Sequence, residues 1–353
     1  MDYKKDSIAD DEVWNIEVPK DEIIQETEKL KREIQKYVGF FKIQSANEWI
    51  DEAEGEPVDK MLFDCFWYEG ELCVLFSSSN LGKSILGYQI ADSITKGKKI
   101  EGFRIEAEGQ PVLYFDFELN KKKFRKRYTQ DNQSPYKFHE SLKRIEMESS
   151  KMTESDVEGY DENTVLERIE QVLTQTDVKV LIVDNMSYMI RNNEKAKDAT
   201  SFLFKLNILK SKHKLSILVL GHTPKREFEK PLSLMDLAGS AAMGNFIDSA
   251  FAIGKVSQNV GERYIKQVKQ RDSEEVYHSE NVCIMKIEKV DSFLQMRFQD
   301  YGIERELLKK VDGESKEELI QKVKDLHTMG KSVREIKEIC NIAQGTVSKY
   351  INM

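Results

Sequence analysis

Cysteine is scarce in this chain, and its spacing is not typical of a metal site or a disulfide framework. The four cysteines among 353 residues are Cys65, Cys73, Cys283 and Cys340. Cys73 and Cys283 lie within apolar runs, where a thiol serves as a small hydrophobic side chain. We therefore expect reduced thiols and no metal bound through cysteine.

Long apolar runs are also lacking. No stretch approaches the roughly 18 apolar residues of a membrane span, and the N-terminus MDYKKDSIADDE has neither the basic nor the apolar region of an export signal. We therefore expect a cytoplasmic protein. The hydrophobic fraction of 40% is enough to fill one large core domain with smaller appendages.

Basic residues are not in excess, since the net charge is −8. The imbalance lies at one end: residues 1–60 hold 17 acidic and 9 basic side chains, whereas the remaining 293 residues hold 45 of each. An acidic extension on a neutral body does not exclude DNA, because binding depends on local basic patches.

The stretch LCVLFSSSNLGKSILGYQIADSI, residues 72–94, reads as a buried strand, a small polar loop and an amphipathic helix. This arrangement is typical of a phosphate-binding loop, in which backbone N–H groups and the helix N-terminus face a triphosphate. Lys83 would reach the β and γ phosphates, and Ser84 would ligate Mg²⁺. The pattern G-x-x-x-x-G-K-[ST] is met except at its first position, where Ser77 replaces glycine. The expected nucleotide-binding residues are Ser77, Ser78, Ser79, Asn80, Leu81, Gly82, Lys83 and Ser84.

Two other strands end in carboxylates. VKVLIVD ends in Asp184, which can hold Mg²⁺ beside the phosphate loop. VLYFDFEL ends in Asp116 and Glu118, which strand alternation would point to one side. One of them can act as general base on the attacking water while the other supports it, and Glu118, farther out, is the better base.

The alternation of β-rich runs at 72–76, 112–117, 180–184 and 216–220 with helical stretches predicts an α/β fold with a parallel sheet flanked by helices. The later runs FAIGKV, ERYIKQVKQR, NVCIMKIEKV and FLQMRFQD predict antiparallel strands that extend it. An apolar stripe from Ile23 to Val38 predicts a helix that starts at Asp21 and stops at Gly39. We expect three parts: an acidic extension with one helix (1–59), an ATPase domain (60–300), and a linker with a small all-α module (301–353).

Residues 60 to 297 resemble the RecA-like core ATPases, and within them the RepA-type hexameric replicative helicases of plasmids and mobile elements. The resemblance implies ATP and Mg²⁺ as cofactors and Glu118 as catalytic base. It implies a γ-phosphate sensor at His222 in SILVLGHTPKR, although a structural histidine remains open. It also implies single-stranded DNA contacts at Lys225, Arg226 and Lys230, for which a solvated loop is the alternative.

The same resemblance bears on assembly. Ring-forming RecA-like helicases project a Lys-x-Arg pair into the neighbouring subunit's nucleotide site, and Lys269 and Arg271 in KQVKQRD match that pair. The guanidinium would stabilise charge on the transferred phosphoryl group. A homo-hexamer or another ring is therefore implied, with exposed edge-strand cations as the alternative.

The C-terminal stretch 316–353 predicts three short helices. Its pattern GKSVREIKEICNIAQGTVSKYI resembles the helix-turn-helix of resolvases and many transcription regulators, whose last helix enters the major groove. The resemblance implies duplex DNA contacts at Gln344, Thr346, Ser348 and Lys349. A small appendage that packs on the core or on a protein partner is the alternative.

Together these features predict an ATP-dependent motor that acts on DNA, most simply a ring helicase in replication or mobilisation of a plasmid or transposon. The alternative is a DNA-binding regulator or initiator that uses ATP as an assembly switch with little translocation, which the altered loop position at Ser77 favours slightly. A protein-interaction scaffold that recruits a partner through the acidic N-terminal helix is a third possibility.

Overall fold

The computed structural model describes residues 24–25, 36–130, 133–154, 160–186, 196–224, 226–237, 241–257, 259, 261–271, 273–309, 316–340, 342 and 344–351. Side chains are described throughout these ranges except at 162, 196–198, 241–242 and 316–319. The chain divides into two compact units, Met1–Val58 and Asp59–Met353. No helix in the described ranges is both long and apolar enough to cross a bilayer.

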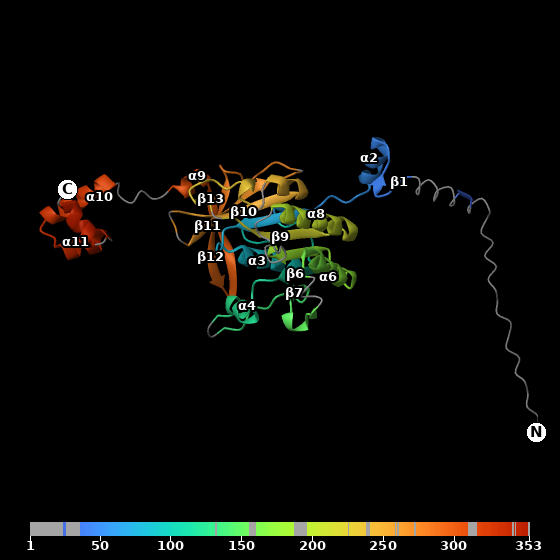
Figure 1. Ribbon diagram of the computed structural model, residues 1–353, viewed down its shortest axis with the longest axis horizontal. Helices are drawn as coiled ribbons and strands as arrows, with labels where there is room; N and C mark the ends of the chain where they lie inside the picture. Colours follow the sequence, from blue (N-terminus) through green and yellow to red (C-terminus); the bar gives the residue numbers. More distant parts are fainter. Residues whose placement is uncertain are drawn as a thin grey trace, which may run out of the picture. The chain divides into compact units, whose positions relative to one another are not determined.

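A nine-stranded sheet organises the second unit (Figure 1), and its spatial order is β13-β12-β11-β10-β5-β9-β8-β6-β7. The strands are β5 (Leu72–Ser77), β6 (Val112–Asp116), β7 (Leu142–Ile145), β8 (Val180–Asp184), β9 (Ser216–His222), β10 (Ser249–Lys255), β11 (Glu262–Lys269), β12 (Val282–Val290) and β13 (Phe293–Gly302). The six strands from β10 to β7 in this order are parallel, and β11 to β13 are antiparallel. The predicted fold class is therefore confirmed.

The helices and short elements of this unit connect and cover the strands. They are α3 (Lys83–Lys96), α4 (Lys121–Arg127), η1 (Ser149–Lys151), α6 (Glu162–Thr174), α8 (Ala196–His213), η2 (Leu234–Asp236), η3 (Ala241–Phe246) and α9 (Glu304–Leu308), with a hairpin of β3 (Met61–Phe63) and β4 (Trp67–Tyr68).

Helices cover both faces of the sheet, because the central strands are apolar on both sides. Along β5, Cys73 and Leu75 pack into the core on the α3 face, where Leu86 and Ile90 lie. Val74 and Phe76 pack into the other core, with α6 and α8. Near-continuous apolar strands of this kind are expected for a parallel sheet buried on both faces.

One strand differs from its predicted direction. FAIGKV forms β10, which was expected to be antiparallel, but it pairs parallel to β5 with Ala250 opposite Val74. The chain from β9 to β10 crosses through the 3₁₀ segments η2 and η3 rather than through a tight hairpin, so β10 can enter in the same direction as β5. The other three runs form β11, β12 and β13, and these are antiparallel as predicted.

The first unit contains a hairpin of β1 (Tyr37–Val38) and β2 (Phe41–Lys42), followed by α2 (Ala46–Glu54). Ser45 and Glu48 form a capping box that starts α2. The helix predicted from Asp21 cannot extend to Val38, because Val38 belongs to β1 and Gly39 takes a positive φ in the turn of the hairpin. Of the predicted helix, Ile24 and Gln25 are helical, and 21–23 and 26–35 lie outside the described residues.

Three helices form the C-terminal part: α10 (Lys316–Thr328), α11 (Val333–Cys340) and α12 (Gln344–Ile351). Val323, Ile336 and Val347, one from each helix, are fully buried together. Ser332 caps α11 through reciprocal hydrogen bonds with Glu335, which lower the pKa of that carboxyl to about 2. The three predicted short helices are present, and their DNA-binding role stays a prediction.

Candidate nucleotide site

The predicted phosphate loop joins the carboxyl end of β5 to the N-terminus of α3. Asn80 and Gly82 both take positive φ, 64° and 101°. Glycine suits position 82 because side chains rarely adopt this positive φ; a Cβ there would also come within 2.3 Å of Met296 Cε, so the methionine side chain would have to shift. Ser79 and Asn80 are exposed, whereas Ser77 and Ser84 are buried at either end of the loop.

Ser77, which stands where the motif has glycine, takes part in the site through its hydroxyl. Its Oγ donates to Ser78 O at 2.8 Å and accepts from Lys83 Nζ at 3.2 Å. Its carbonyl oxygen also accepts from Lys83 Nζ, at 3.1 Å. The substitution therefore adds a polar contact to the lysine expected to bind phosphate.

Lys83 is 5% exposed. Burial lowers the pKa of its ammonium to about 8, although Asp184 and Glu118 oppose the shift. Its Nζ also lies 3.1 Å from Nδ1 of His222. A phosphate group at this position would favour the charged lysine and compete with Ser77 and His222 for it.

Asp184 lies at the end of β8 and is fully buried. Tyr114 donates its hydroxyl to Oδ2 at 2.9 Å. The other oxygen, Oδ1, has no partner with hydrogen-bond geometry in the described part of the chain. Burial raises the pKa of this carboxyl to about 6, and the nearby Ser84 hydroxyl opposes that shift.

These residues fit a magnesium ion. Mg²⁺ takes oxygen ligands, keeps several waters, and is usually held by one or two protein oxygens together with substrate phosphates. Asp184 Oδ1 and the adjacent Ser84 hydroxyl supply such oxygens. Among the described residues, no group of three or more His, Cys, Asp or Glu side chains is arranged so that it could hold a metal ion by itself.

Glu118 is connected to Lys83 through two side chains. The Asn185 amide donates to Glu118 Oε2 at 2.9 Å, and the same nitrogen lies 3.2 Å from His222 Nε2. Burial and the charge of Lys83 lower the pKa of His222, which favours the neutral ring. A neutral imidazole has one acceptor nitrogen, so Lys83 and Asn185 cannot both donate to it. A phosphate that draws Lys83 away would remove this competition.

Asp116 is occupied by structural hydrogen bonds. Its Oδ1 accepts from the backbone N–H groups of Glu118 and Leu119 at 3.1 and 2.8 Å. Its Oδ2 accepts from Tyr88 and from Arg144 Nε at 2.8 and 2.9 Å. The structure thus places Asp116 as the residue that shapes the turn carrying Glu118, which leaves Glu118 as the carboxylate that faces Asn185.

Lys269 and Arg271 lie at the opposite end of the sheet from the phosphate loop. Lys269 pairs with Ala250 of β10, and its Nζ donates to the carbonyl oxygens of Gly244 and Ile247. Arg271 forms an ion pair with Asp248 at 2.9 Å, and Asp248 also accepts from the N–H of Leu72 at the start of β5. The five residue steps from Leu72 to Ser77 correspond to about 17 Å, so neither cation belongs to its own chain's nucleotide site.

The three basic residues after His222 have different environments. Arg226 has a side chain only 11% exposed, 3.4 Å from Asp236, and donates to the carbonyl oxygens of Lys230 and Pro231. Lys230 is exposed and lies 3.2 Å from Glu227. Lys225 lies outside the described residues. Arg226 thus braces its loop, and Lys230 is available at the surface.

On α12, the side chains of Gln344, Ser348 and Lys349 are exposed, and Thr346 is half-buried. The Ser348 hydroxyl donates to Gln344 O at 3.2 Å. Val347 points into the small core. The predicted reading residues therefore share a helix whose opposite face is packed.

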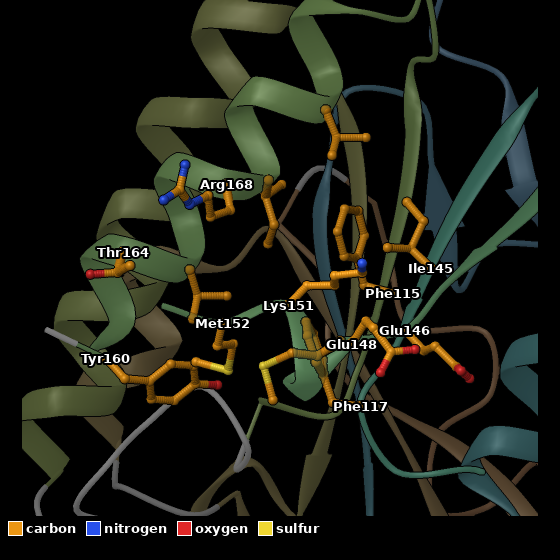
Figure 2. A pocket seen from close by; sticks show the side chains of 14 residues that line it. Phe115, Phe117, Ile145, Glu146, Glu148, Lys151, Met152, Tyr160, Thr164 and Arg168 are labelled. Atoms are coloured by element: carbon orange, nitrogen blue, oxygen red, sulfur yellow. The ribbon is translucent and has the colours of Figure 1, made fainter. Parts of the chain in front are cut away.

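An apolar cavity of about 430 Å³ adjoins the Glu118 turn (Figure 2). Phe115, Phe117 and Ile145 line it from the sheet, and Arg168 and Thr164 come from α6. Phe117 directly precedes Glu118, and it also lines a more polar cavity of about 640 Å³ that contains Glu118 itself.

Three residues of the site were not identified from sequence. Asn185 bridges Glu118 and His222, Tyr114 orients Asp184, and Arg144 braces Asp116. The position of Asn185, directly after the strand-ending Asp184, was a usable signal. Tyr114 and Arg144 offered none, because their partners lie 70 and 28 residues away in the chain.

Comparison with known proteins gives one family. A family model described as an AAA domain matches residues 41–227, which is more than half of the chain. The match includes the phosphate loop, Glu118, Asp184 and His222, and it ends before Lys269, Arg271 and the three C-terminal helices. No curated protein matches the chain.

Proposed function

Because the chain belongs to the AAA domain family of P-loop ATPases, we propose that it hydrolyses ATP with Mg²⁺ to drive work on DNA, as a ring helicase. The observation that carries this proposal is the meeting of Lys83, Glu118, Asp184 and His222 at one end of the parallel sheet. Ligands of open α/β sheets bind at the carboxyl ends of the strands.

In this proposal each residue has a distinct task. Lys83 and the loop N–H groups bind the phosphates, and Ser84 and Asp184 hold Mg²⁺, which would neutralise charge on the phosphates. Glu118 orients the attacking water and accepts its proton. His222 senses whether Lys83 is engaged, and Asn185 passes that state to Glu118.

The ring is supported by the placement of Lys269 and Arg271. Both cations lie toward the amino end of β5, away from the phosphate loop of their own chain, at the sheet end that a neighbouring subunit could approach. Arg271 has a side chain 48% exposed and bonded to Asp248, so it can exchange that carboxylate for a neighbour's phosphate. Hydrolysis would then depend on assembly.

The test is DNA-stimulated ATP hydrolysis by the full chain. We expect stimulation by single-stranded DNA, loss of nucleotide binding in Lys83→Ala, and retained binding without turnover in Glu118→Gln. Glu108→Gln removes an exposed carboxylate outside the site and should behave as wild type. Full turnover in Glu118→Gln would contradict the assignment of the base.

A second function, an ATP-switched DNA-binding regulator, is favoured by one observation. The Ser77 hydroxyl and carbonyl oxygens both accept a hydrogen bond from Lys83. A glycine could offer only the carbonyl, so the serine gives phosphate one more contact to displace. Duplex binding that depends on ATP, with negligible turnover under all DNA conditions, would support this function over the motor. Ser77→Gly should then raise turnover.

A further inference from the structure

Helix α4 carries an unusual density of positive charge. Its seven residues, Lys121–Arg127, read KKKFRKR and contain six cations and no acid. The helix lies at the periphery of the core (Figure 1), just beyond the Glu118 turn. In the described part of the chain, the one carboxylate in ion-pairing range of these cations is Glu146, 3.4 Å from Lys121.

Local helix energetics do not explain these cations. The macrodipole favours positive charge in the last turn, which accounts for Arg125, Lys126 and Arg127, but disfavours it in the first turn. Lys121 and its two neighbours occupy that first turn. The i,i+4 like-charge pairs, such as Lys122 with Lys126, each destabilise the helix by about 0.2–0.5 kcal/mol. An anionic partner would reverse both effects.

The rest of the structure holds α4 in place and turns its charges outward. Phe124 packs on Tyr88 and Tyr128, with ring centroids 5.1 and 4.9 Å apart. Asn120 caps the first turn through Lys123 N at 2.9 Å. The side chains opposite Phe124 are exposed, namely Lys122, Lys123, Arg125 and Lys126.

The geometry points to the sugar–phosphate backbone of a nucleic acid as the partner. Seven helical residues span about 10 Å, which matches the axial length of about three phosphates of one duplex strand at 3.4 Å each. The aromatic neighbours are turned inward, so α4 offers cations for phosphates and no ring for a base to stack on. We propose that α4 is a sequence-independent backbone-binding surface that controls ATP hydrolysis.

A chain of contacts connects this surface to the catalytic base. Lys121 pairs with Glu146, and Glu146 pairs with Arg144 at 2.5 Å. Arg144 binds Asp116, which accepts the N–H of Glu118. Lys121 and Lys122 also line the same cavity of about 640 Å³ as Glu118. A phosphate that draws Lys121 away from Glu146 would change the restraint on the Glu118 turn.

This inference rests on the proposed function for its effect on hydrolysis, but binding tests it independently. The test variant is Lys123→Gln/Arg125→Gln/Lys126→Gln in the full chain, which leaves the lining of the Glu118 cavity intact, and glutamine keeps helix propensity. The matched control, Lys98→Gln/Lys99→Gln/Lys286→Gln, removes three exposed charges elsewhere. Binding to oligo-dT and to a mixed-sequence duplex is measured across salt concentrations, together with ATP turnover with and without each DNA.

We expect the α4 variant to lose affinity equally for all single-stranded sequences. The slope of log K against log salt should become shallower by about 2, because each of about three lost phosphate contacts contributes roughly 0.7 to the slope. DNA stimulation should fall while turnover without DNA stays unchanged. The control should match wild type. The measurement with the mixed-sequence duplex shows whether the surface also binds double strands.

Two results would overturn the inference. If wild type binds and is stimulated by DNA and the α4 variant behaves like the control, α4 is not the surface, although the proposed function stands. If the α4 variant gains turnover without DNA, the α4 cations restrain hydrolysis through contacts within the protein and not through a nucleic acid. A wild-type protein that binds no nucleic acid would refute both this inference and the DNA part of the proposed function.

Discussion

Two buried aspartates lie at neighbouring strand ends, and removing the charge of each should change the stability of the protein in opposite directions. Asp184 Oδ1 has no hydrogen-bond partner among the described residues, and burial raises the pKa of its carboxyl from 3.8 to about 6. Asp116 is bonded by Arg144, Tyr88 and two N–H groups. We predict that Asp184→Asn stabilises the protein measured without nucleotide, whereas Asp116→Asn destabilises it.

The magnitude follows from proton linkage. A carboxyl whose pKa is raised on folding binds its proton more tightly in the native state, so its ionised form costs stability above pH 6. That cost disappears as the pH falls through 6 toward 4. A rise of the pKa from 3.8 to about 6 lowers the free energy of unfolding by about 3 kcal/mol at pH 7.5 and by roughly half of that at pH 5. Loss of Asp184 also removes an attraction for Lys83, so we expect a net gain of about 2–3 kcal/mol at pH 7.5.

The control substitution, Asp116→Asn, should lower the free energy of unfolding. Asp116→Asn leaves the Arg144 guanidinium with a weakened partner in a largely buried site, which should cost about 3 kcal/mol. Urea unfolding followed by circular dichroism at pH 5 and 7.5 measures both variants against wild type. Equal destabilisation by the two substitutions, or a gain for Asp184→Asn that does not shrink at pH 5, would refute the reasoning.

Three further predictions concern the site and the C-terminal helices. Asn185→Ala removes the bridge between Glu118 and His222, so turnover should fall at least tenfold (about 1.4 kcal/mol) with nucleotide affinity retained; equal losses of both, in steady-state kinetics and fluorescent-nucleotide titration, would contradict this. Arg144→Lys should lower kcat with little change in KM, because one ammonium cannot replace the guanidinium's contacts with Asp116, Glu146 and Leu119; a KM effect alone would count against it. Ile336→Asp should unfold the three C-terminal helices and abolish duplex binding while ATP hydrolysis without DNA persists, a result that limited proteolysis and an ATPase assay can check or contradict.

Local signals made much of the fold predictable. The apolar runs that became β5, β6, β8 and β9 were found within a residue or two of their observed bounds, because a strand buried on both faces reads as a continuous hydrophobic stretch. The strand, loop and helix of the predicted phosphate loop could be identified from sequence because their residues are consecutive. The direction of β10 was missed, since a strand's own sequence does not say which neighbour it will pair with.

The site residues that escaped prediction act through distant partners. In the sequence, Arg144 has no feature that distinguishes it from other cations on edge strands. Its contact with Asp116 arises only because β7 pairs with β6. The equivalence that strand alternation implied for Asp116 and Glu118 is not seen, because β6 ends at Asp116 and the following turn takes Glu118 to Asn185. The end of the predicted helix falls on β1, because the apolar stripe of residues 23–38 fits a helical period although Tyr37 and Val38 pair with β2.

The position of Phe117 has a pharmacological consequence. Its ring lines an apolar cavity of about 430 Å³ (Figure 2), a size that suits a drug-like molecule. The next residue in the chain is Glu118, so a compound seated there would press on the backbone of this proposed base while leaving the phosphate loop open. Such a compound would inhibit ATP hydrolysis without competing with ATP, so high cellular ATP concentrations would not reduce its effect.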